Sequence, residues 1–519
     1  MVMYEAETEH NVDIPLPKLL EGESWERVED IPPYTPAEPP SSIRELQRLA
    51  QVKAEGEVGT FGPTLAALAL ERPGENASQE LRKYEALFGR DSLRVALDVM
   101  PMYPLLMHAT IHSLASLQGT ATHAAREEEP GRIIHEYRRP EDPVALELTS
   151  RYGWEWPYYG SVDATPQYMH ALYQYSRHTA GGASIFRETT KSLDGHTRTI
   201  GDTYRAALTW VENRMNANPE GFIEYKSSIP AGIENQVWRD SWDSYFHTDG
   251  TLANRKQGIA SVEVQQLAYD ALIEAAIVYE TEFGDREKSA SLRARAETLR
   301  EKIIEHFWVD EKGGYFALGT DRDDDGNLRQ LKIRTSNMGH LLRSRLLVGE
   351  EYRPFREAVI AQLFSPEMLN ISGVRTLAKD EARFRPGAYH NGSVWLWDTY
   401  YIAEGLRYHG YYGLASFLAE KIHTVINVTQ KFPEYVRGDD LPTPTINPRI
   451  VDIWDKKAER VNRIEQPPQE VQAWSVAADI AREYYSGRVP DRAYDARAVQ
   501  LEDAILRMVI EHETQALAI

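Results

Sequence analysis

The chain has 519 residues, of which 42% are hydrophobic, enough to build a substantial core. At this length we expect either two domains or one large repetitive architecture. Its 58 basic and 79 acidic residues give a formal net charge of −21, which argues against a general affinity for nucleic acid or anionic membranes. The sequence contains no cysteine, so disulfides and thiolate chemistry are excluded.

The first residues of the chain indicate in which cellular compartment the protein is expected. Residues 1–15 are acidic and polar, without the basic start and apolar stretch of a signal peptide. No apolar run is long enough to span a bilayer. We therefore expect a cytoplasmic protein whose partner is a small molecule rather than a nucleic acid or a membrane, and we predict no particular oligomeric state.

The first eighty residues differ from the rest. The proline-rich segment 32–40 cannot form a helix or a central strand, so we expect it to lie extended on the surface of a core formed later in the chain. Ile43 to Lys53 has the pattern of one short helix. We therefore predict an N-terminal extension, residues 1–79, that packs on a catalytic domain, residues 80–519.

From Asp91 onward the apolar spacing is mostly helical. The clear amphipathic runs are Ser92–Gln118, Arg205–Asn216, Val262–Phe283, Lys288–Phe307, Trp395–His409, Leu414–Val428, Val471–Tyr485 and Val499–Glu513. Loops rich in Trp, Tyr, His, Asp and Gly separate them, and function usually resides in such loops.

One predicted hairpin interrupts the helices. Its strands are residues 313–318 and 328–333, around the acidic turn 323–327. The turn resembles a calcium loop, but Lys332 stands where the bidentate glutamate would be, and strands flank it instead of helices. We interpret it as a solvated turn.

Helices punctuated by chemical loops over more than four hundred residues suggest a solenoid or a closed toroid. No fixed repeat period, the sign of a solenoid, is visible. A toroid of helical hairpins brings every second loop to one face, so polar clusters far apart in sequence converge. The predicted fold is therefore all-α, an (α/α)6 barrel with one small β-hairpin.

The most distinctive loop runs from Trp238 to Ser244, where Arg239, Asp240 and Asp243 lie between or beside two indoles. An indole offers a flat apolar face to a sugar ring, while carboxylates and guanidinium groups hydrogen-bond its hydroxyls. A carboxyl group held against such a ring can keep its proton, because burial disfavours the charged form. The loop thus predicts a sugar site with a general acid.

Other clusters stand at helix entrances. Phe88–Ser92 and Tyr158–Pro166 each contain an aspartate whose simplest role is to cap a helix. Gly131–Arg138 concentrates ionisable groups and is either a surface charge pattern or part of a site. Tyr389–Asp398 combines hydrogen-bonding groups with two indoles, and a buried tryptophan is more often core than a sugar platform.

Together these residues resemble a known family. The segment from Leu87 to about Ala478 is similar to the glucosidase portion of glycogen debranching enzymes, the amylo-α-1,6-glucosidase-like proteins of bacteria. Ten blocks match in the same order: Leu87–Ser92, Glu128–Arg138, Tyr158–Pro166, Asn235–Ser244, Ser261–Gln265, Thr335–His340, Ser372–Leu377, Tyr389–Trp395, Pro433–Glu434 and Gln472–Ser475. Residues before about Ser78 lie outside the resemblance.

The resemblance implies an inverting α-glycosidase on an (α/α)6 barrel. Inversion needs two carboxyl groups about 6.5–9.5 Å apart, one to protonate the leaving oxygen and one to activate water. The family's acid follows a tryptophan with one residue between, which matches Asp240. The family's base lies in a Pro-Glu context shortly before a Gln-Ala-Trp-Ser helix, which matches Glu434.

Alternatives remain for both roles. Asp243 matches relatives in which the tryptophan directly precedes the acid, although Asp240 is favoured. Glu465 and Glu470 compete with Glu434 for the base, because residues 436–468 resemble an insertion whose path the sequence does not reveal.

By the same resemblance, the predicted substrate-binding residues are Arg90, Asp91, Asp163, Trp238, Asp243, Glu263, His390, Asn391 and Trp395. For Glu263, capping of a helix and binding of substrate or of Arg90 are equally compatible with its position. We expect no metal and no cofactor, since no cluster of His and carboxylate shows ligand spacing.

The substrate is less defined. Leu396-Trp397 stands where relatives commonly have Pro-His, and their N-terminal β-rich domain is replaced by the short proline-rich lead. A small α-glucoside or another compact glycoside is therefore as compatible as an α-1,6-linked limit dextrin. The alternatives are an N-acylglucosamine 2-epimerase-type isomerase, in which His135, His247, His340 and His390 would converge, a glycoside phosphorylase, and a sugar-binding protein with an inactive site.

Overall fold

The computed structural model describes residues 40–52, 61–68, 84–139, 141–229, 232–446, 449–455, 460–466, 468–488 and 495–517. Of the predicted N-terminal extension, most lies outside these ranges, including the proline-rich residues 32–39. The side chain of Glu465, one of the alternatives for the base, also lies outside the described part.

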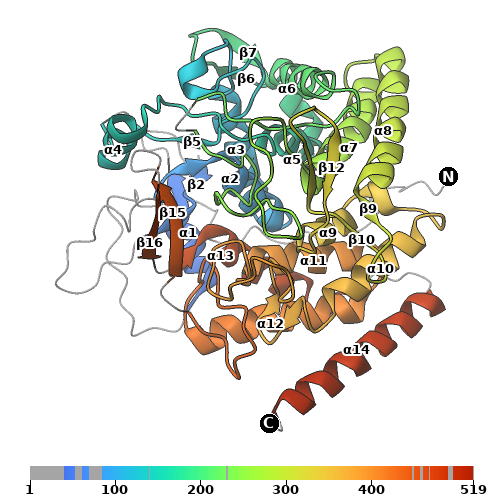
Figure 1. The fold of residues 1–519 in the computed structure, drawn as a ribbon. Helices are drawn as coiled ribbons and strands as arrows, with labels where there is room; N and C mark the ends of the chain where they lie inside the picture. The colour runs from blue at the N-terminus through green and yellow to red at the C-terminus, as the bar shows by residue number, and fades with distance from the viewer. Residues whose placement is uncertain are drawn as a thin grey trace.

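Helices dominate this part of the chain (Figure 1). The α-helices are α1 (Ser42–Leu49), α2 (Gly89–Val99), α3 (Pro104–Ser116), α4 (Pro143–Tyr152), α5 (Ala164–His178), α6 (Ile200–Met215), α7 (Val262–Thr281), α8 (Arg286–Phe307), α9 (Asn337–His340), α10 (Arg353–Leu363), α11 (Leu396–Tyr408), α12 (Tyr412–Thr429), α13 (Ala473–Tyr485) and α14 (Ala496–Leu517). Short 3-10 helices are η3 (Ala124–Arg126), η4 (Gly182–Arg187), η5 (Leu341–Arg343) and η6 (Arg345–Leu347). The mostly helical class predicted from the sequence is confirmed.

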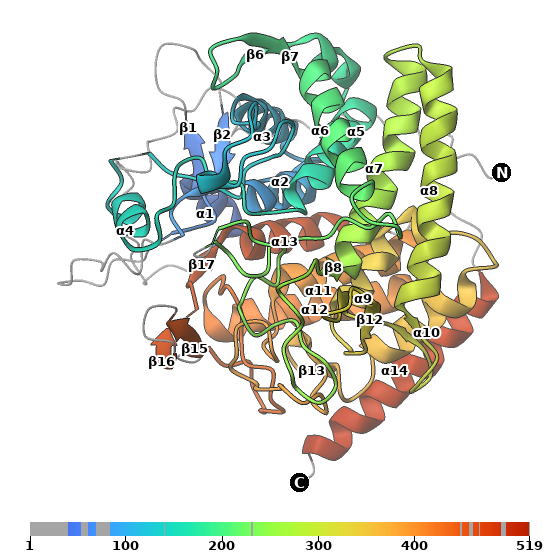
Figure 2. The ribbon, with the colours of Figure 1, turned by 45° about the horizontal axis from the view of Figure 1, so that its top comes forward.

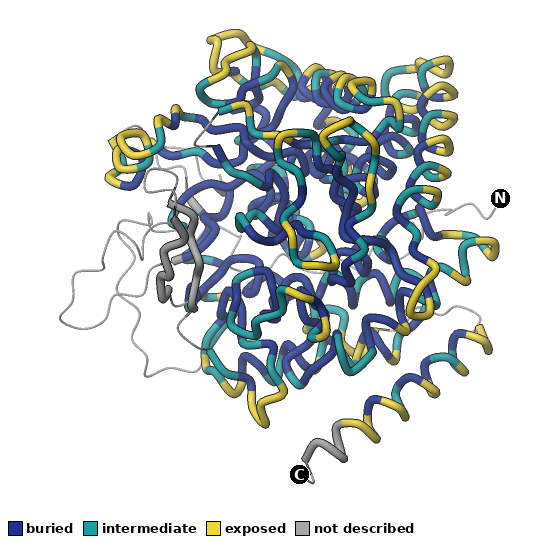
Figure 3. The backbone as a smooth tube through the Cα atoms, viewed as in Figure 1, coloured by how far each residue is buried: buried dark blue, intermediate teal, exposed yellow. Residues whose placement is uncertain are grey.

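Within the described part, six helices contact one another in a closed cycle. α2 packs on α5, α5 on α7, α7 on α9, α9 on α11, α11 on α13, and α13 again on α2. We call these six the inner helices. In Figures 1 and 2, α2, α11 and α13 lie toward the middle of the molecule, where the backbone trace of Figure 3 is mostly buried, and α7 runs beside α8 toward one side.

Five of the inner helices pack on the α-helix that follows them in the chain: α2 on α3, α5 on α6, α7 on α8, α9 on α10, and α11 on α12. The pattern of buried residues differs between an inner helix and the helix that packs on it. In α8 the buried residues Leu292, Ala296, Leu299 and Ile303 follow the spacing of one helix face, and most of the others are accessible. α7 is buried on nearly every side. α8 therefore covers α7 from outside.

The predicted single run Ser92–Gln118 is wrong in one respect, because it forms two helices, α2 and α3. Pro104 is the first residue of α3, where a proline needs no N–H partner. In the interior of one long helix the same ring would break the backbone hydrogen-bond ladder. The chain turns instead, and the N–H of Tyr103 donates to the carbonyl of Val99 at 2.8 Å.

The predicted hairpin is present, but its first strand is shifted. β11 (Gly319–Arg322) pairs with β12 (Leu328–Leu331) and, on its other side, with β8 (Ala260–Ser261). Residues predicted for the first strand instead form β10 (Tyr315–Phe316), which pairs with β9 (Trp308–Val309).

The physical reason for the shift is a turn. Gly313 and Gly314 have positive φ values of 88° and 92°, so the chain reverses there before β10. At the acidic turn, Asp323 accepts hydrogen bonds from the N–H groups of Asp325 and Asn327, as a solvated turn would.

The remaining strands are short and pair antiparallel. The pairs are β1 (Ala50–Val52) with β2 (Phe61–Thr64), β3 (Ala67–Leu68) with β17 (Val471–Gln472), β4 (Leu87–Phe88) with β5 (Glu136–Tyr137), β6 (Thr189–Lys191) with β7 (Thr197–Thr199), β13 (Leu369–Asn370) with β14 (Gly373–Val374), and β15 (Arg449–Asp455) with β16 (Arg460–Gln466). The hairpin β15–β16 lies within the predicted insertion, residues 436–468.

The first described elements join the last inner helix. α1 packs on α13, and β3 pairs with β17 directly before α13. Leu46 and Leu49 of α1 belong to one buried apolar cluster with Trp395 and Trp474. No helix of the described residues combines the length and the apolarity needed to cross a bilayer.

Candidate active site

Five residues predicted for the site stand where inner helices begin. Arg90 and Asp91 lie in the first turn of α2, and Glu263 lies in the first turn of α7. Asp163 directly precedes α5, and Trp395 directly precedes α11. Because these helices belong to one cycle, residues far apart in sequence meet.

Arg90 is the centre of an ion-pair cluster. Its Nε lies 2.7 Å from Oδ2 of Asp163, and its Nη1 lies 3.9 Å from Oδ2 of Asp240. Asp163 makes no capping bond with its side chain, and its other oxygen accepts the hydroxyl of Ser161 at 2.5 Å. Asp163 therefore holds Arg90 rather than a helix terminus.

Two features of this cluster suit a ligand. The Nη2 of Arg90 is buried and has no hydrogen-bond partner among the described residues. A donor left in this state costs free energy until a ligand accepts from it. The side chain of Asp240 is 30% exposed, whereas those of Arg90 and Asp163 are 9% and 4% exposed. An accessible carboxyl group thus stands beside a buried donor.

Asp91 links the two proposed catalytic carboxyls. Burial is the largest of the effects that raise the pKa of Asp91 to about 7. The nearby carboxylates of Asp240, Asp163 and Glu434 act in the same direction, and the charge of Arg90 opposes them. Asp240 and Glu434, which come from distant parts of the chain, are therefore both close enough to Asp91 to affect its proton.

Glu434 is buried, and two donors orient its carboxylate. The hydroxyl of Tyr389 donates to Oε1, and the N–H of Gln469 donates to Oε2 at 3.1 Å. The N–H of Glu434 donates in turn to the carbonyl of Gln469 at 2.8 Å. Its competitor Glu470 is instead paired with Lys431.

Trp238 is packed among aromatic rings. His390 and Trp397 meet it edge to face at centroid distances of 5.2 and 5.0 Å, and Trp395 meets it in the same way at 6.2 Å. His340 lies 5.7 Å away. These neighbours hold the indole rigidly next to Asp240, two residues further along the chain.

The rest of the 238–244 loop is fixed by hydrogen bonds. The Arg239 guanidinium is fully buried and donates to the carbonyl of Thr376 at 2.6 Å. Asn391 donates to the carbonyl of Asp243 at 3.0 Å, and the carboxylate of Asp243 accepts from Arg385 at 2.8 Å. Asn391 and Asp243 thus support the loop, and the substrate binding that the resemblance implied for them stays a prediction.

Glu263 also has protein partners. Its Oε2 accepts from the hydroxyl of Ser261 and, at 2.7 Å, from the amide of Asn337. Burial raises the pKa of Glu263, while these two hydrogen bonds oppose the shift. The predicted contact between Glu263 and Arg90 is not among its described hydrogen bonds and ion pairs; both residues line one cavity.

A narrow cavity of about 40 Å³ lies inside the cycle of inner helices. It is lined by Arg90, Arg94, Asp163, Gln167, Trp238, Glu263, Gln266, Leu267, His340, Trp397, Tyr401 and Trp474. Of these residues, Arg90, Asp163, Trp238 and Glu263 were predicted from the sequence to bind substrate, and the others were not. Gln167, Gln266 and Tyr401 lie on the helices that begin at the site, and their inward direction depends on how the helices pack.

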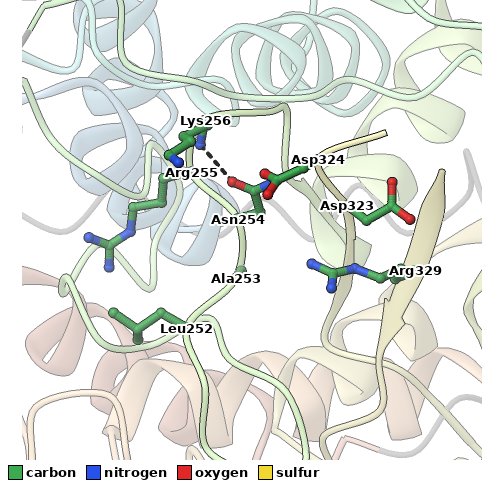
Figure 4. A pocket seen from close by; sticks show the side chains of 8 residues that line it. All are labelled: Leu252, Ala253, Asn254, Arg255, Lys256, Asp323, Asp324 and Arg329. Carbon is green, nitrogen blue, oxygen red and sulfur yellow. Dashed lines mark hydrogen bonds between the residues drawn. The ribbon is translucent and has the colours of Figure 1, made fainter. Parts of the chain in front are cut away.

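A second, larger hollow of about 530 Å³ lies between the loop 252–256 and the hairpin β11–β12 (Figure 4). Its basic side chains are Arg255, Lys256 and Arg329, and its acidic ones are Asp323 and Asp324. The Nη2 of Arg255 is buried without a hydrogen-bond partner among the described residues. Burial lowers the pKa of Arg255, and nearby acidic groups oppose that shift.

The four histidines of the epimerase alternative occupy different surroundings. His340 and His390 both contact Trp238. His135 is buried, and burial lowers its pKa well below the ordinary range. His247 pairs instead with an aspartate of β11 at 3.0 Å. His340 and His390 therefore both lie against Trp238, whereas His247 belongs to the hairpin region.

One protein family matches part of the chain. Residues 264–440 match the family described as "Mannosylglycerate hydrolase MGH1-like glycoside hydrolase domain". This segment covers less than half of the chain. It contains His390 and Trp395, which were predicted to bind substrate, and the predicted base Glu434, and it begins after the predicted acid Asp240. It agrees with the glycosidase class predicted from the sequence, and no curated protein matches the chain.

A solved structure matches over most of the chain. It is the GH63 mannosylglycerate hydrolase from Thermus thermophilus, in complex with Tris and D-glycerate. The match has a TM-score of 0.54 at 14% identity, and it covers 85% of this chain and 98% of that one. The two proteins share a fold. The glucosidase resemblance remains a prediction beside it.

Proposed function

We propose that this protein is an inverting glycoside hydrolase in which Asp240 is the general acid and Glu434 the general base. One observation carries the proposal: the two carboxyl groups, from distant loops, both act on Asp91, and Asp240 lies 3.9 Å from Arg90, whose buried Nη2 has no hydrogen-bond partner within the described part of the chain. The matches to glycoside hydrolases support the same class.

In this proposal the sugar at the cleaved bond lies against Trp238, with its hydroxyls bound by Arg90, Asp91 and Asp163. Asp240 donates its proton to the glycosidic oxygen as the bond from C1 to that oxygen breaks. Glu434 accepts a proton from the water that attacks C1 on the opposite face. An α-glycoside thus yields a β-sugar, and water is the only co-reactant.

We also propose that the closed cycle of inner helices is the predicted (α/α)6 toroid. Each inner helix would carry an outer partner, and the starts of the inner helices would surround the substrate. The contacts α2–α3, α5–α6, α7–α8 and α11–α12 support this arrangement. The split into an extension, residues 1–79, and a catalytic domain, residues 80–519, is part of the same proposal.

For the substrate we propose a compact α-glycoside with an acidic aglycone. Arg385 contacts the 238–244 loop through Asp243, and Arg255 contributes a second cation with an unpaired nitrogen among the described residues. A carboxylate is the natural partner of such guanidinium groups. The matched hydrolase was solved with D-glycerate, which is such an acid. An uncharged α-glucoside, including an α-1,6-linked limit dextrin, is the alternative.

A substrate screen with proton NMR of the released sugar tests this proposal. The panel holds mannosylglycerate, glucosylglycerate, isomaltose and a limit dextrin. We expect cleavage of one of the acidic glycosides, with the β-anomer appearing first. Release of the α-anomer would contradict inversion. A new reducing sugar without cleavage would identify an epimerase, and turnover that requires phosphate would identify a phosphorylase.

Two aspartates of the same loop provide the matched test of the acid. Asp240→Asn should lower kcat by about a hundredfold or more, since general acid catalysis contributes on that scale. Asp243→Asn should keep most of kcat and lower stability, because Asp243 pairs with Arg385. Near-normal turnover in Asp240→Asn together with an inactive Asp243→Asn would reverse the assignment.

Rescue of activity by azide tests whether Glu434 is the general base. Glu434→Ala should be inactive and should recover turnover when azide replaces the attacking water, because the small anion needs no proton acceptor. Full activity of Glu434→Ala without azide would remove Glu434 from the mechanism.

A further inference from the structure

A group of possible metal ligands lies outside the proposed active site. His108 and His112 lie on α3, and Glu188 follows the 3-10 helix η4. Among the described residues, these three form the one set of histidine and acidic side chains whose donor atoms all lie within 4.8 Å of one another.

The two histidines share one face of α3, because residues four apart on a helix are neighbours. Their rings lie 4.5 Å apart between centroids. Both Nε2 atoms approach the same carboxylate oxygen, Oε2 of Glu188, at 2.8 and 2.9 Å. Three donor atoms from two separate elements therefore converge on one point.

The backbone holds Glu188 in this position. Its N–H donates to the carbonyl of Ile185 at 3.0 Å, and its carbonyl accepts from the N–H of Ile200 at 2.8 Å. The segment after Glu188 is β6, which contacts α3. The ligand from this segment is thus placed by structure that exists without any ion.

The geometry is near that of a zinc site with two histidines and one carboxylate. In such a site the nitrogen and oxygen ligands lie about 2.0–2.2 Å from the ion, which puts ligand atoms roughly 3.3 Å apart. The nitrogen–oxygen distances here are shorter by about half an ångström, a change that small side-chain rotations supply. The side chains are 24–37% exposed, so a water molecule can reach the fourth position.

We propose that His108, His112 and Glu188 form a binding site for one divalent transition-metal ion, with Zn²⁺ as the expected occupant. The imidazole nitrogens and the carboxylate suit zinc, and magnesium or calcium would require more oxygen ligands. On binding, each histidine coordinates the ion through the unprotonated Nε2 of a neutral imidazole that carries its proton on Nδ1. A proton on Nε2 leaves to solvent where the ring was an imidazolium, and is replaced by one on Nδ1 where the ring was neutral. The ion joins α3 to the segment that leads into α6.

Zinc titration of the full chain, after treatment with a chelator, tests this proposal. We expect calorimetry to show one tight Zn²⁺ per chain and the Tm to rise with zinc concentration, because the ion binds the folded state. Co²⁺ should give the visible absorption of a tetrahedral site. Since the chain has no cysteine, thiolates cannot account for either signal.

Two variants identify the ligands. His112→Gln should weaken Zn²⁺ binding by at least about tenfold, since loss even of an outer partner costs that much. His123→Gln is the matched control, because it removes another accessible histidine, which lies 3.6 Å from Glu155. It should bind zinc as the wild type does.

The proposal is wrong if wild-type protein shows no stoichiometric zinc binding, or if His112→Gln keeps the same affinity and the same rise in Tm. Magnesium serves as the control ion, and an equal effect of magnesium would point to general charge screening by divalent cations. Neither outcome depends on glycosidase activity, so the site is tested separately from the proposed function.

Discussion

The carboxyl group of Asp91 is buried among charges of its own sign, and this makes folding sensitive to pH. Its folded-state pKa of about 7 is higher than the value of about 4 in an unfolded chain. The stability that goes with the bound proton is therefore complete below about pH 4 and is lost as the pH rises through 7. One pKa unit corresponds to about 1.4 kcal/mol, so the total is a few kcal/mol.

Asp91→Asn tests this directly. Asparagine does not titrate, so the free energy of unfolding of the wild type, measured relative to the variant, should fall between about pH 4 and pH 7. Denaturant unfolding across that range measures the difference. Asp249→Asn is a control of opposite sign, because hydrogen bonds from Thr251 lower the pKa of exposed Asp249. A constant difference between wild type and Asp91→Asn would contradict the prediction.

The hydroxyl of Tyr389 donates to Glu434, so its removal should impair the proposed base. A hydrogen bond to a charged group contributes about 1.5–3 kcal/mol, which corresponds to roughly a tenfold to hundredfold loss of kcat/KM in Tyr389→Phe. Steady-state kinetics on the cleaved substrate measure it. Tyr400→Phe, another buried tyrosine, should keep normal kinetics, and equal losses in both variants would indicate a general packing effect.

Asp240 and Glu434 were proposed from the family resemblance, through its Trp-x-Asp spacing and its Pro-Glu context, and their catalytic roles stay predictions. The sequence could not show that Asp163 binds Arg90 instead of capping α5, because a cap and an ion-pair partner look alike before the helices are packed. The supporting role of Asn391 was hidden for the same reason.

At the scale of elements, α2 depends on a close approach at its first residue. A Cβ atom on Gly89 would lie 2.2 Å from the backbone carbonyl oxygen of Ile134, which cannot move freely. Gly89→Ala should therefore shift the start of α2, lower stability by about 1–3 kcal/mol, and lower kcat/KM through Arg90 and Asp91. Thermal unfolding and kinetics measure the two effects.

Gly413→Ala is the matched control, since this glycine also lies in the first turn of a helix. Its Cβ would meet Oε1 of Glu502 at 3.2 Å, the far end of a flexible side chain. We expect a change in stability within about 1 kcal/mol, because alanine favours the helix. If Gly89→Ala were equally mild, the contact with Ile134 would not fix α2.

Long amphipathic elements were predicted well, and α7, α8, α11, α12 and α13 begin and end within a few residues of the expected ranges. The breaks and turns between helices and strands were harder to predict from the sequence. The break at Pro104 required a choice between a kink and two helices, and the shift of the hairpin depended on the turn at Gly313-Gly314. The four-residue helix α9 is too short to show a helical period.

At the scale of the whole molecule, the cycle of inner helices is closed by the packing of α13 on α11 and α2. Trp474 of α13 is 5% exposed and stacks on Trp397 at a centroid distance of 5.0 Å. Trp474→Ala should lower the free energy of unfolding by about 3–5 kcal/mol, as large buried aromatic truncations do. Denaturant unfolding followed by circular dichroism measures the loss.

Leu146→Ala is the control for that variant, because Leu146 is 57% exposed on α4. Its effect should stay within about 0.5 kcal/mol. A loss of similar size in both variants would mean that the packing of Trp474 contributes no more to the free energy of unfolding than an exposed leucine does.

The closed cycle of helices was expected from the sequence only by exclusion of a solenoid and by resemblance. Nothing in the local pattern of α2 or α13 says that they touch, since each apolar face would fit several neighbours. The same limit applies to the pairing of β3 with β17. Contacts between the two ends of a long chain follow from the global packing and not from any one segment.

The contact between α2 and α13 also has a consequence for how the protein is made. During translation α2 leaves the ribosome early, and its partner α13 follows only after the other inner helices, a delay of roughly tens of seconds at about 5–20 residues per second. Through that interval the apolar side of α2 that α13 will cover stays uncovered. The growing chain is thus a natural client for chaperones until its last inner helix emerges.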